Sequence, residues 1–152
     1  MDEFYMKKAI EIADTSTYEV PVGAIIVRNG EIIGRGWNSR ETDKDPTAHA
    51  EIMAIKEAAK ILGGWRLIGC TMYVTLEPCA MCAGAIVNAR IPRLVIGASD
   101  PRFGCCGSLM DLVRNPSFNH QVELTTGVLE DECSALLSNF FKRIRESDKN
   151  NV

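Results

Sequence analysis

Residues 71–98, TMYVTLEPCAMCAGAIVNARIPRLVIGA, contain the pattern that decides the fold. The apolar run 71–76 is typical of a buried strand, and the nearly all-apolar stretch 79–90 has the length of a helix. A second apolar strand pattern follows at 93–98. Because two strands joined through a helix form a right-handed parallel βαβ unit, the sequence predicts an α/β fold.

The segments before this unit add a helix, a hairpin and a second helix. Helical spacing of apolar residues predicts an amphipathic helix over residues 2–14. Two apolar runs flank Asn29-Gly30 and predict a β-hairpin, because both turn residues tolerate positive φ. The polar, proline-containing segment 38–48 is expected to be a loop, and a helix is expected over about 49–62.

The segments after the βαβ unit complete one domain. We expect a glycine-containing loop over 99–108, a strand near 121–126 and a C-terminal helix over about 131–145. Residues 146–152 are expected to form a disordered tail. The sequence shows neither repeat nor linker, so residues 1–152 are interpreted as a single α/β domain with helices on both faces of its sheet.

Composition limits the possible classes of protein. Of the 152 residues, 46% are hydrophobic and 24% charged, which is typical of a soluble globular domain. The N-terminus has no signal-peptide pattern and no apolar stretch could cross a bilayer, so a cytoplasmic protein without membrane contact is predicted. The net charge of −3 shows no global basic character, so an RNA partner would need a local basic patch. In such a protein, six cysteines indicate metal binding or free thiols rather than disulfides.

Two helix starts carry the residues that indicate chemistry. Cys79 and Cys82 lie three positions apart on the first turn of one predicted helix, where free N–H groups and the helix dipole favour thiolates. His49 opens another helix. One imidazole and two thiolates suit zinc, and three protein ligands leave the fourth tetrahedral position open to water. Such a water has its pKa lowered from ~16 toward ~7 and can supply hydroxide at neutral pH.

Glu51 follows His49 by two residues, about 200° around a helix, so it is poorly placed as a second ligand. In the first turn it can still reach a water beside the metal, take up its proton and pass that proton to a leaving amine. Taken alone, a Cys-x-x-Cys pair is often a redox pair and a His-x-Glu pair is often part of a helix cap. Together, His-x-Glu and Pro-Cys-x-x-Cys form the signature of zinc nucleobase deaminases.

Beyond this signature, the sequence resembles the bacterial tRNA-specific adenosine deaminases, which convert the wobble adenosine of an anticodon to inosine. The resemblance covers nearly the whole chain, in the stretches EVPVGAIIV, GWNSR, DPTAHAEIMAI, RLIGCTMYVTLEPCAMCAGAIV, GSLMDL and LEDECSALLSNFFKRIR. It implies a cytidine-deaminase-like three-layer sandwich with a five-stranded mixed sheet between helices. It also implies a homodimer, one Zn²⁺ per subunit and a tRNA anticodon stem-loop as partner.

The resemblance also implies roles for individual residues. His49, Cys79 and Cys82 resemble the zinc ligands, and Glu51 resembles the proton shuttle. Hydroxide would attack C6 of adenine and ammonia would leave. Further residues resemble substrate contacts: Asn38 to the flipped adenine, Val22 and the backbone of Ala48 around the base, and Asp100 to the adjoining sugar-phosphate.

Two further stretches are open to two interpretations. Arg102 could bind a phosphate and Phe103 could stack on a base, or both could belong to a solvated turn. Phe141 and Arg143, in FFKRIR at 140–145, could form a half-buried aromatic pair beside a solvated basic face. The family resemblance instead favours RNA contact for Phe141 and Arg143, through a local, salt-sensitive patch.

Three other functions remain open from the sequence. A deaminase of free cytosine, cytidine, guanine or a pteridine-like base needs the same hydroxide and proton shuttle. A zinc-stabilised RNA-binding module needs no carboxylate beside an open metal position, so Glu51 argues against it. A thiol oxidoreductase would use Cys79 and Cys82 as a redox pair and would tolerate zinc chelation under reducing conditions.

Overall fold

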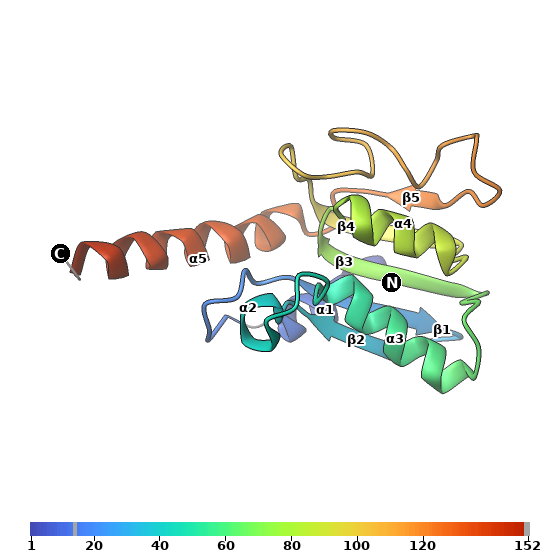
Figure 1. The fold of residues 1–152 in the computed structure, drawn as a ribbon, viewed down its shortest axis with the longest axis horizontal. Coiled ribbons are helices and arrows are strands. Elements are labelled where there is room, and N and C mark those ends of the chain that lie inside the picture. Colours follow the sequence, from blue (N-terminus) through green and yellow to red (C-terminus); the bar gives the residue numbers. More distant parts are fainter. Residues whose placement is uncertain (14, 151–152) are drawn as a thin grey trace.

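The computed structural model describes residues 1–13 and 15–150 (Figure 1). In chain order, the described elements are α1 (Asp2–Ile12), β1 (Gly23–Arg28), β2 (Glu31–Trp37), α2 (Arg40–Asp43), α3 (Ala50–Leu62), β3 (Cys70–Leu76), α4 (Ala80–Asn88), β4 (Arg93–Ala98), β5 (Glu123–Thr125) and α5 (Glu130–Asn150).

The strands form one mixed five-stranded sheet in the order β2-β1-β3-β4-β5. β1 pairs antiparallel with β2 and with β3, whereas β3, β4 and β5 are parallel. The parallel β3–β4 pair, joined through α4, confirms the predicted βαβ unit. The predicted hairpin is also confirmed, since Asn29 and Gly30 have φ values of 51° and 78°.

The helices lie on both faces of this sheet, as predicted. On one face, α3 and α4 cover alternate strand residues such as Ile26 and Met72 (Figure 1). On the other face, α1 and the start of α5 cover the intervening residues such as Ile25 and Tyr73. This alternation follows from the two-residue period of a strand and produces the three-layer sandwich.

Small residues bring α3 close to β2. A Cβ atom at Gly36 would lie 1.9 Å from the carbonyl oxygen of Ala50, and one at Gly34 would lie 2.4 Å from that of Ala54. Only glycine permits so close an approach of helix backbone to strand. Because Ala50 is the first residue of α3, Gly36 also fixes how deeply the start of this helix, next to His49, sits on the sheet.

The structure corrects two predictions and sets helix bounds. Segment 38–48, predicted as a loop, contains the short helix α2, whose C-cap residue Lys44 has a left-handed φ of 51°. The prediction of a disordered tail from residue 146 was wrong for 146–150, which continue α5, while 151–152 lie outside the described residues. Asp14, predicted within the first helix, also lies outside them.

In the described part of the chain, none of the helices has the length and apolar character needed to cross a membrane.

Candidate metal centre and active-site pocket

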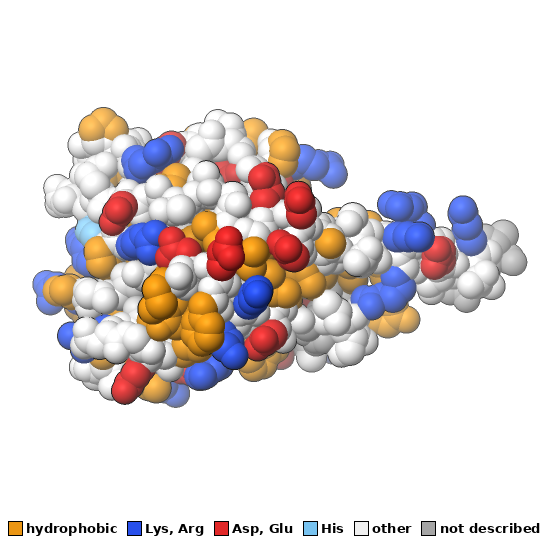
Figure 2. Space-filling model, turned by 180° about the vertical axis from the view of Figure 1, so that it is seen from behind, with side chains coloured by type: hydrophobic (Ala, Val, Ile, Leu, Met, Phe, Trp, Pro, Cys, Tyr) orange, Lys and Arg blue, Asp and Glu red, His pale blue; other side chains and the backbone are white. Residues whose placement is uncertain are grey.

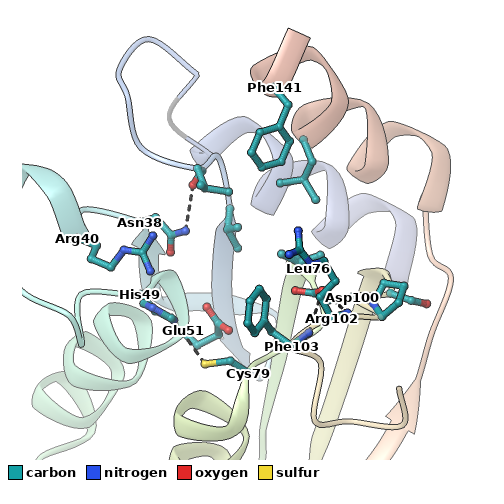
Figure 3. A pocket seen from close by; sticks show the side chains of 15 residues that line it. Asn38, Arg40, His49, Glu51, Leu76, Cys79, Asp100, Arg102, Phe103 and Phe141 are labelled. Atoms are coloured by element: carbon teal, nitrogen blue, oxygen red, sulfur yellow. Dashed lines mark hydrogen bonds between the residues drawn. The ribbon is translucent and has the colours of Figure 1, made fainter. Parts of the chain in front are cut away.

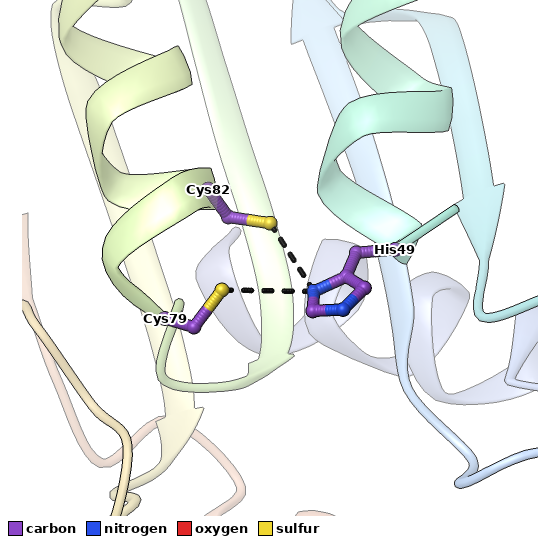
Figure 4. A group of neighbouring side chains, drawn as sticks. All are labelled: His49, Cys79 and Cys82. Atoms are coloured by element: carbon purple, nitrogen blue, oxygen red, sulfur yellow. Dashed lines mark hydrogen bonds between the residues drawn. The ribbon is translucent and has the colours of Figure 1, made fainter. Parts of the chain in front are cut away.

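Two helix starts bring His49, Cys79 and Cys82 together (Figure 4). His49 and Cys79 are the N-cap residues of α3 and α4, and both have extended backbone conformations. Cys82 lies one turn into α4. The Nδ1 atom of His49 is 3.6 Å from the Sγ of Cys79 and 3.5 Å from the Sγ of Cys82.

The geometry of this triad fits a zinc ion. The three ligand atoms lie within 4.8 Å of one another. A tetrahedral angle between a Zn–S bond of about 2.3 Å and a Zn–N bond of about 2.0 Å places nitrogen and sulfur about 3.5 Å apart. The observed Nδ1–Sγ distances of 3.5 and 3.6 Å match that separation. The donor set therefore suits one zinc ion, with a fourth coordination position available to a reactant.

Strong mutual interactions shift the pKa values of the two thiols in opposite directions. A hydrogen bond from the Cys82 thiol and another with His49 outweigh burial and lower the pKa of Cys79 to about 3. The same Cys79–Cys82 bond, together with burial, raises the pKa of Cys82. The hydrogen bond to Cys79 raises the pKa of His49. The surroundings of Cys79 therefore favour its thiolate, the form that binds a metal.

Glu51 occupies the first turn of α3 and is 4% exposed. Figure 3 shows its carboxyl group beside His49 and Cys79, facing the pocket. Burial raises its pKa to about 7, against the opposing effects of a bond to its own backbone N–H and the charge of His49. A carboxyl group with a pKa near neutrality can both accept and donate a proton.

Above the triad, the structure has a pocket of about 600 Å³. This volume is in the range of small-ligand sites and accommodates a nucleobase with part of its sugar. Its lining residues are Val20, Val22, Asn38, Arg40, His49, Glu51, Leu76, Cys79, Ser99, Asp100, Pro101, Arg102, Phe103, Leu137 and Phe141.

Asn38 lines the pocket through an amide whose orientation is fixed by the backbone. Its Nδ2 donates to the carbonyl of Val20 at 3.0 Å, and its Oδ1 accepts from the N–H of Ala50 at 2.9 Å. A primary amide has two N–H groups and two oxygen lone pairs, so these bonds use half of its capacity. Asn38 can therefore brace the start of α3 and still offer a donor and an acceptor to a ligand.

Val22 and the backbone of Ala48 were both expected beside the base, but only one of them lines the pocket. Val22 is buried and lines it, but Ala48 is not among the lining residues. The carbonyl of Ala48 accepts from Ser39 N–H, and its own N–H donates to Asp45. The backbone of Ala48 therefore stabilises the loop beside the pocket.

Asp100 and Arg102 both line the pocket from the loop after β4. The Oδ1 of Asp100 accepts from the N–H groups of Arg102 and Phe103 at 3.1 and 3.2 Å. The guanidinium of Arg102 lies 5.7 Å from the centroid of the Phe103 ring, in cation–π range. Asp100 thus shapes the turn that presents Arg102 and Phe103.

On α5, Phe141 lines the pocket whereas Arg143 does not. Phe141 packs edge-on against the buried Phe140 at 5.3 Å. The guanidinium of Arg143 donates to the carbonyls of Thr15 and Thr17, the latter at 3.1 Å, and thereby ties α5 to the segment after α1.

Several pocket residues were not identified from the sequence. They are Val20, Arg40, Leu76, Ser99, Pro101 and Leu137. Helical spacing places Leu137 one turn before Phe141, on the same face of α5, so that residue could have been found. Arg40 had no comparable signal, because it enters the pocket through α2, which the sequence did not predict.

The remaining cysteines and the second histidine lie outside the triad. Cys70, Cys105, Cys106 and Cys133 are buried and free, and none joins the triad within the described residues. The Nε2 atom of His120 lies 2.7 Å from the carbonyl oxygen of Ile91. In residues 1–13 and 15–150, His49, Cys79 and Cys82 are therefore the one group found that could hold a metal ion.

A three-layer sandwich with a His-Cys-Cys triad and a buried glutamate under a pocket defines the class of zinc-dependent deaminases. The model of the cytidine and deoxycytidylate deaminase zinc-binding region matches residues 1–98. The tRNA-specific adenosine deaminase of Bacillus subtilis (strain 168) is 54% identical over 97% of this chain and 93% of that protein. The enzyme of the same name from Haemophilus influenzae is 50% identical over 97% of this chain and 87% of that protein.

A solved structure from work on A-to-I editing by tRNA:A34 deaminases at the wobble position of transfer RNA is also similar. It has a TM-score of 0.83 and 41% identity, and the match covers 88% of this chain and 99% of that one. The chain belongs to the cytidine and deoxycytidylate deaminase family and, within it, to the tRNA-specific adenosine deaminases.

Proposed function

We propose that this protein hydrolyses adenosine to inosine at the wobble position of a tRNA anticodon. The observation that carries this proposal is the carboxyl group of Glu51, buried beside the His49-Cys79-Cys82 triad and facing the pocket (Figure 3). A structural zinc site has no use for such a group. Relatives named tRNA-specific adenosine deaminase, with about half of their residues identical, support adenosine in tRNA as the substrate.

The reaction replaces the C6 amino group of adenine by oxygen, with one water consumed and one ammonia released. His49, Cys79 and Cys82 would hold a zinc ion, which supplies a Lewis acid that activates the attacking water. Glu51 accepts a proton from that water while the C6–O bond forms. It delivers this proton to the ring nitrogen. It then takes up the second proton, from the new hydroxyl group on C6, and passes it to the amino group, which departs as ammonia when the C6–N bond breaks.

The substrate contacts are also part of the proposal. Asn38 would use its remaining N–H and lone pair on the edge of the adenine, and Val22 would pack against the base. Asp100 and Arg102 would contact the adjoining sugar-phosphate from the far side of the pocket. A base must leave its stack to enter, which an anticodon loop permits at lower cost than a duplex.

The C-terminal half of α5 supports the binding of a polyanion. It carries Lys142, Arg143, Arg145 and Lys149, all exposed, against Glu146 and Asp148. Figure 2 shows Lys and Arg side chains along this projecting helix. The chain as a whole has a net charge of −3, so RNA attraction would come from such a local patch and weaken as salt rises.

A homodimer and a cytoplasmic location complete the proposal. The exposed apolar side chains of Leu109 and Met110 are 57% and 54% accessible and lie in the loop between β4 and β5. Such side chains suit a surface between subunits. The cytoplasmic location is proposed because tRNA is the substrate. Light scattering of the purified protein measures the oligomeric state directly.

The test compares wild type with Glu51→Gln on an anticodon stem-loop that contains a wobble adenosine, with inosine and bound zinc quantified in both. Wild type is expected to form inosine. The variant is expected to retain zinc but to lose activity by about 10²-fold to 10⁴-fold, the usual contribution of a general acid–base group.

Glu57→Gln is the matched control for this test. Glu57 lies on α3 as well, but its exposed carboxylate accepts from the N–H of Arg35, outside the pocket. This control should turn over like wild type. Full activity of Glu51→Gln would refute the proton-carrying role. Zinc-loaded wild type that forms no inosine would refute tRNA as the substrate, and free cytosine and guanine would be assayed next.

A further inference from the structure

Glu77 lies between the end of β3 and Pro78, two residues before the metal-site residue Cys79, and is 6% exposed. It does not line the pocket. Its Oε1 accepts from the N–H of Asp100 at 3.0 Å and from the hydroxyl of Ser108 at 2.5 Å. Its Oε2 accepts from the N–H groups of Cys106 and Ser108 at 3.0 and 3.1 Å.

Loop 99–108 packs tightly around the carboxylate of Glu77. A Cβ atom at Gly104 would lie 2.3 Å from Cδ of Glu77 and 2.5 Å from the carbonyl oxygen of Asp100. The neighbouring N–H of Cys105 donates to the carbonyl of Pro78 at 2.9 Å. The segment that leads into the metal site and the loop are therefore joined through side chain and backbone alike.

The four bonds to Glu77 come from donors that are 23 to 31 residues away in the sequence. A carboxylate accepts only, and a buried one must be satisfied by several donors. This loop satisfies Glu77 only in a conformation that turns three N–H groups inward at once. The same conformation presents Asp100, Arg102 and Phe103 to the pocket.

We infer that Glu77 is a positioning residue. It holds the pocket-lining part of loop 99–108 in a fixed position relative to the metal site that includes Cys79. Without this carboxylate the loop loses its anchor, and substrate contacts from Asp100, Arg102 and Phe103 become mobile. The zinc ligands remain in place, because the helix starts that carry them pack on the sheet. The identity of the substrate in this inference rests on the proposed function. The anchoring of loop 99–108 by Glu77 does not.

The test is Glu77→Gln, which preserves size but replaces one acceptor oxygen by an NH₂ group that faces N–H donors. Amide hydrogen exchange over 99–108 should accelerate by about tenfold or more, as expected when a buried bond to a charged group is lost. Zinc content should match wild type. On the anticodon stem-loop, KM should rise by about tenfold while kcat changes by less than about threefold, because binding geometry and not proton transfer is altered.

Asp111→Asn is the matched control, because it makes the same carboxylate-to-amide change in the same connection between β4 and β5. The carboxylate of Asp111 accepts from the backbone N–H and Nε of Arg114, outside the pocket. Exchange over 99–108 and KM should stay at wild-type values. A milder variant guards against misfolding of Glu77→Gln: Ser108→Ala removes the hydroxyl donor alone. It should raise exchange and KM in the same direction by smaller factors.

Unchanged exchange over 99–108 in Glu77→Gln would overturn the inference. So would a lower thermal stability with unchanged KM, because that result would give Glu77 a purely structural role. If wild type forms no inosine, the proposed function fails, but accelerated exchange in Glu77→Gln with zinc retained would still support the anchoring of the loop.

Discussion

The pocket floor, made by the His-Cys-Cys triad and Glu51, is carried by first helical turns that pack on the sheet. The pocket wall, made by loop 99–108 and the part of α5 with Leu137 and Phe141, is held largely by hydrogen bonds to segments far away in the sequence. Side chains of the wall are also more exposed, at 63% for Phe103 and 48% for Phe141.

This difference separates chemistry from substrate fit. Close backbone packing, as at Gly36 and Ala50, leaves the floor little freedom. Hydrogen bonds hold the wall in one arrangement. A substitution can remove one of these hydrogen bonds without leaving a cavity in the core. A change in the floor should therefore affect metal and turnover, and a change in the wall should affect the binding of substrate.

The largest effect is expected from a change in the floor. Cys82→Ala removes one of three ligands and should weaken zinc binding by more than about 100-fold, the upper range seen for groups that only support ligands. Inosine formation should fall below detection. Cys133→Ala is the control, because this thiol is equally buried but lies against α1 and the sheet, and it should retain zinc while costing about 1 kcal/mol of stability. Zinc analysis and activity that match wild type in Cys82→Ala would contradict the assignment of the floor.

A smaller effect is expected in the wall. Arg143→Ala removes the bonds that tie α5 to the carbonyls of Thr15 and Thr17, and KM should rise by roughly tenfold at unchanged zinc content. Arg145→Ala removes the same charge from an exposed position on the same helix. Its KM should rise by no more than about threefold, and high salt should abolish that difference because it is electrostatic. Equal effects of both variants at every salt concentration would show that Arg143 acts by charge alone.

The smallest effect is expected outside both regions, where α1 is tied to the sheet. Asp2 forms an ion pair with Arg93 at 2.7 Å and accepts from the hydroxyl of Tyr73 at 3.0 Å. The bond to Arg93 lowers the pKa of Asp2 below its ordinary value of 3.8, although burial opposes it. Because the folded pKa is depressed, this stabilisation is complete above pH 3.8 and is lost as pH falls through the folded value.

Asp2→Asn should therefore lower the free energy of unfolding by about 1 kcal/mol at pH 7, as is usual for a partly exposed pair. The difference between wild type and variant should shrink towards acid, and urea unfolding at pH 7 and at pH 3 measures it. Unchanged kcat and KM are expected at pH 7. A variant difference that grows towards acid would contradict the sign of the shift.

The floor was largely predictable from the sequence because its signals are local. His49, Glu51, Cys79 and Cys82 were each placed at a helix start by residues within a few positions of them. The Asn29-Gly30 turn and the apolar strand patterns were predictable for the same reason. Patterns of this kind depend on backbone geometry and on side-chain periodicity, which neighbouring residues determine.

Candidate residues of the wall were named from the sequence, but the contacts that hold the wall in place were not predictable from local patterns. The bonds of the Arg143 guanidinium go to carbonyls 126 and 128 residues away, for which no local pattern gave a signal. α5 was expected to end near residue 145 but continues to Asn150. The role of Glu77 had no local signal, because its four donors belong to a loop that starts more than 20 residues later.

The sequence by itself determined which residues can bind zinc and carry a proton, and on which elements they lie, because residue type and local spacing specify both. Only the tertiary structure decided that two helix starts meet with ligand atoms within 4.8 Å, and that a buried carboxylate holds the opposite side of the pocket. These distances arise from packing and hydrogen bonds between segments far apart in the chain, and no local pattern encodes them.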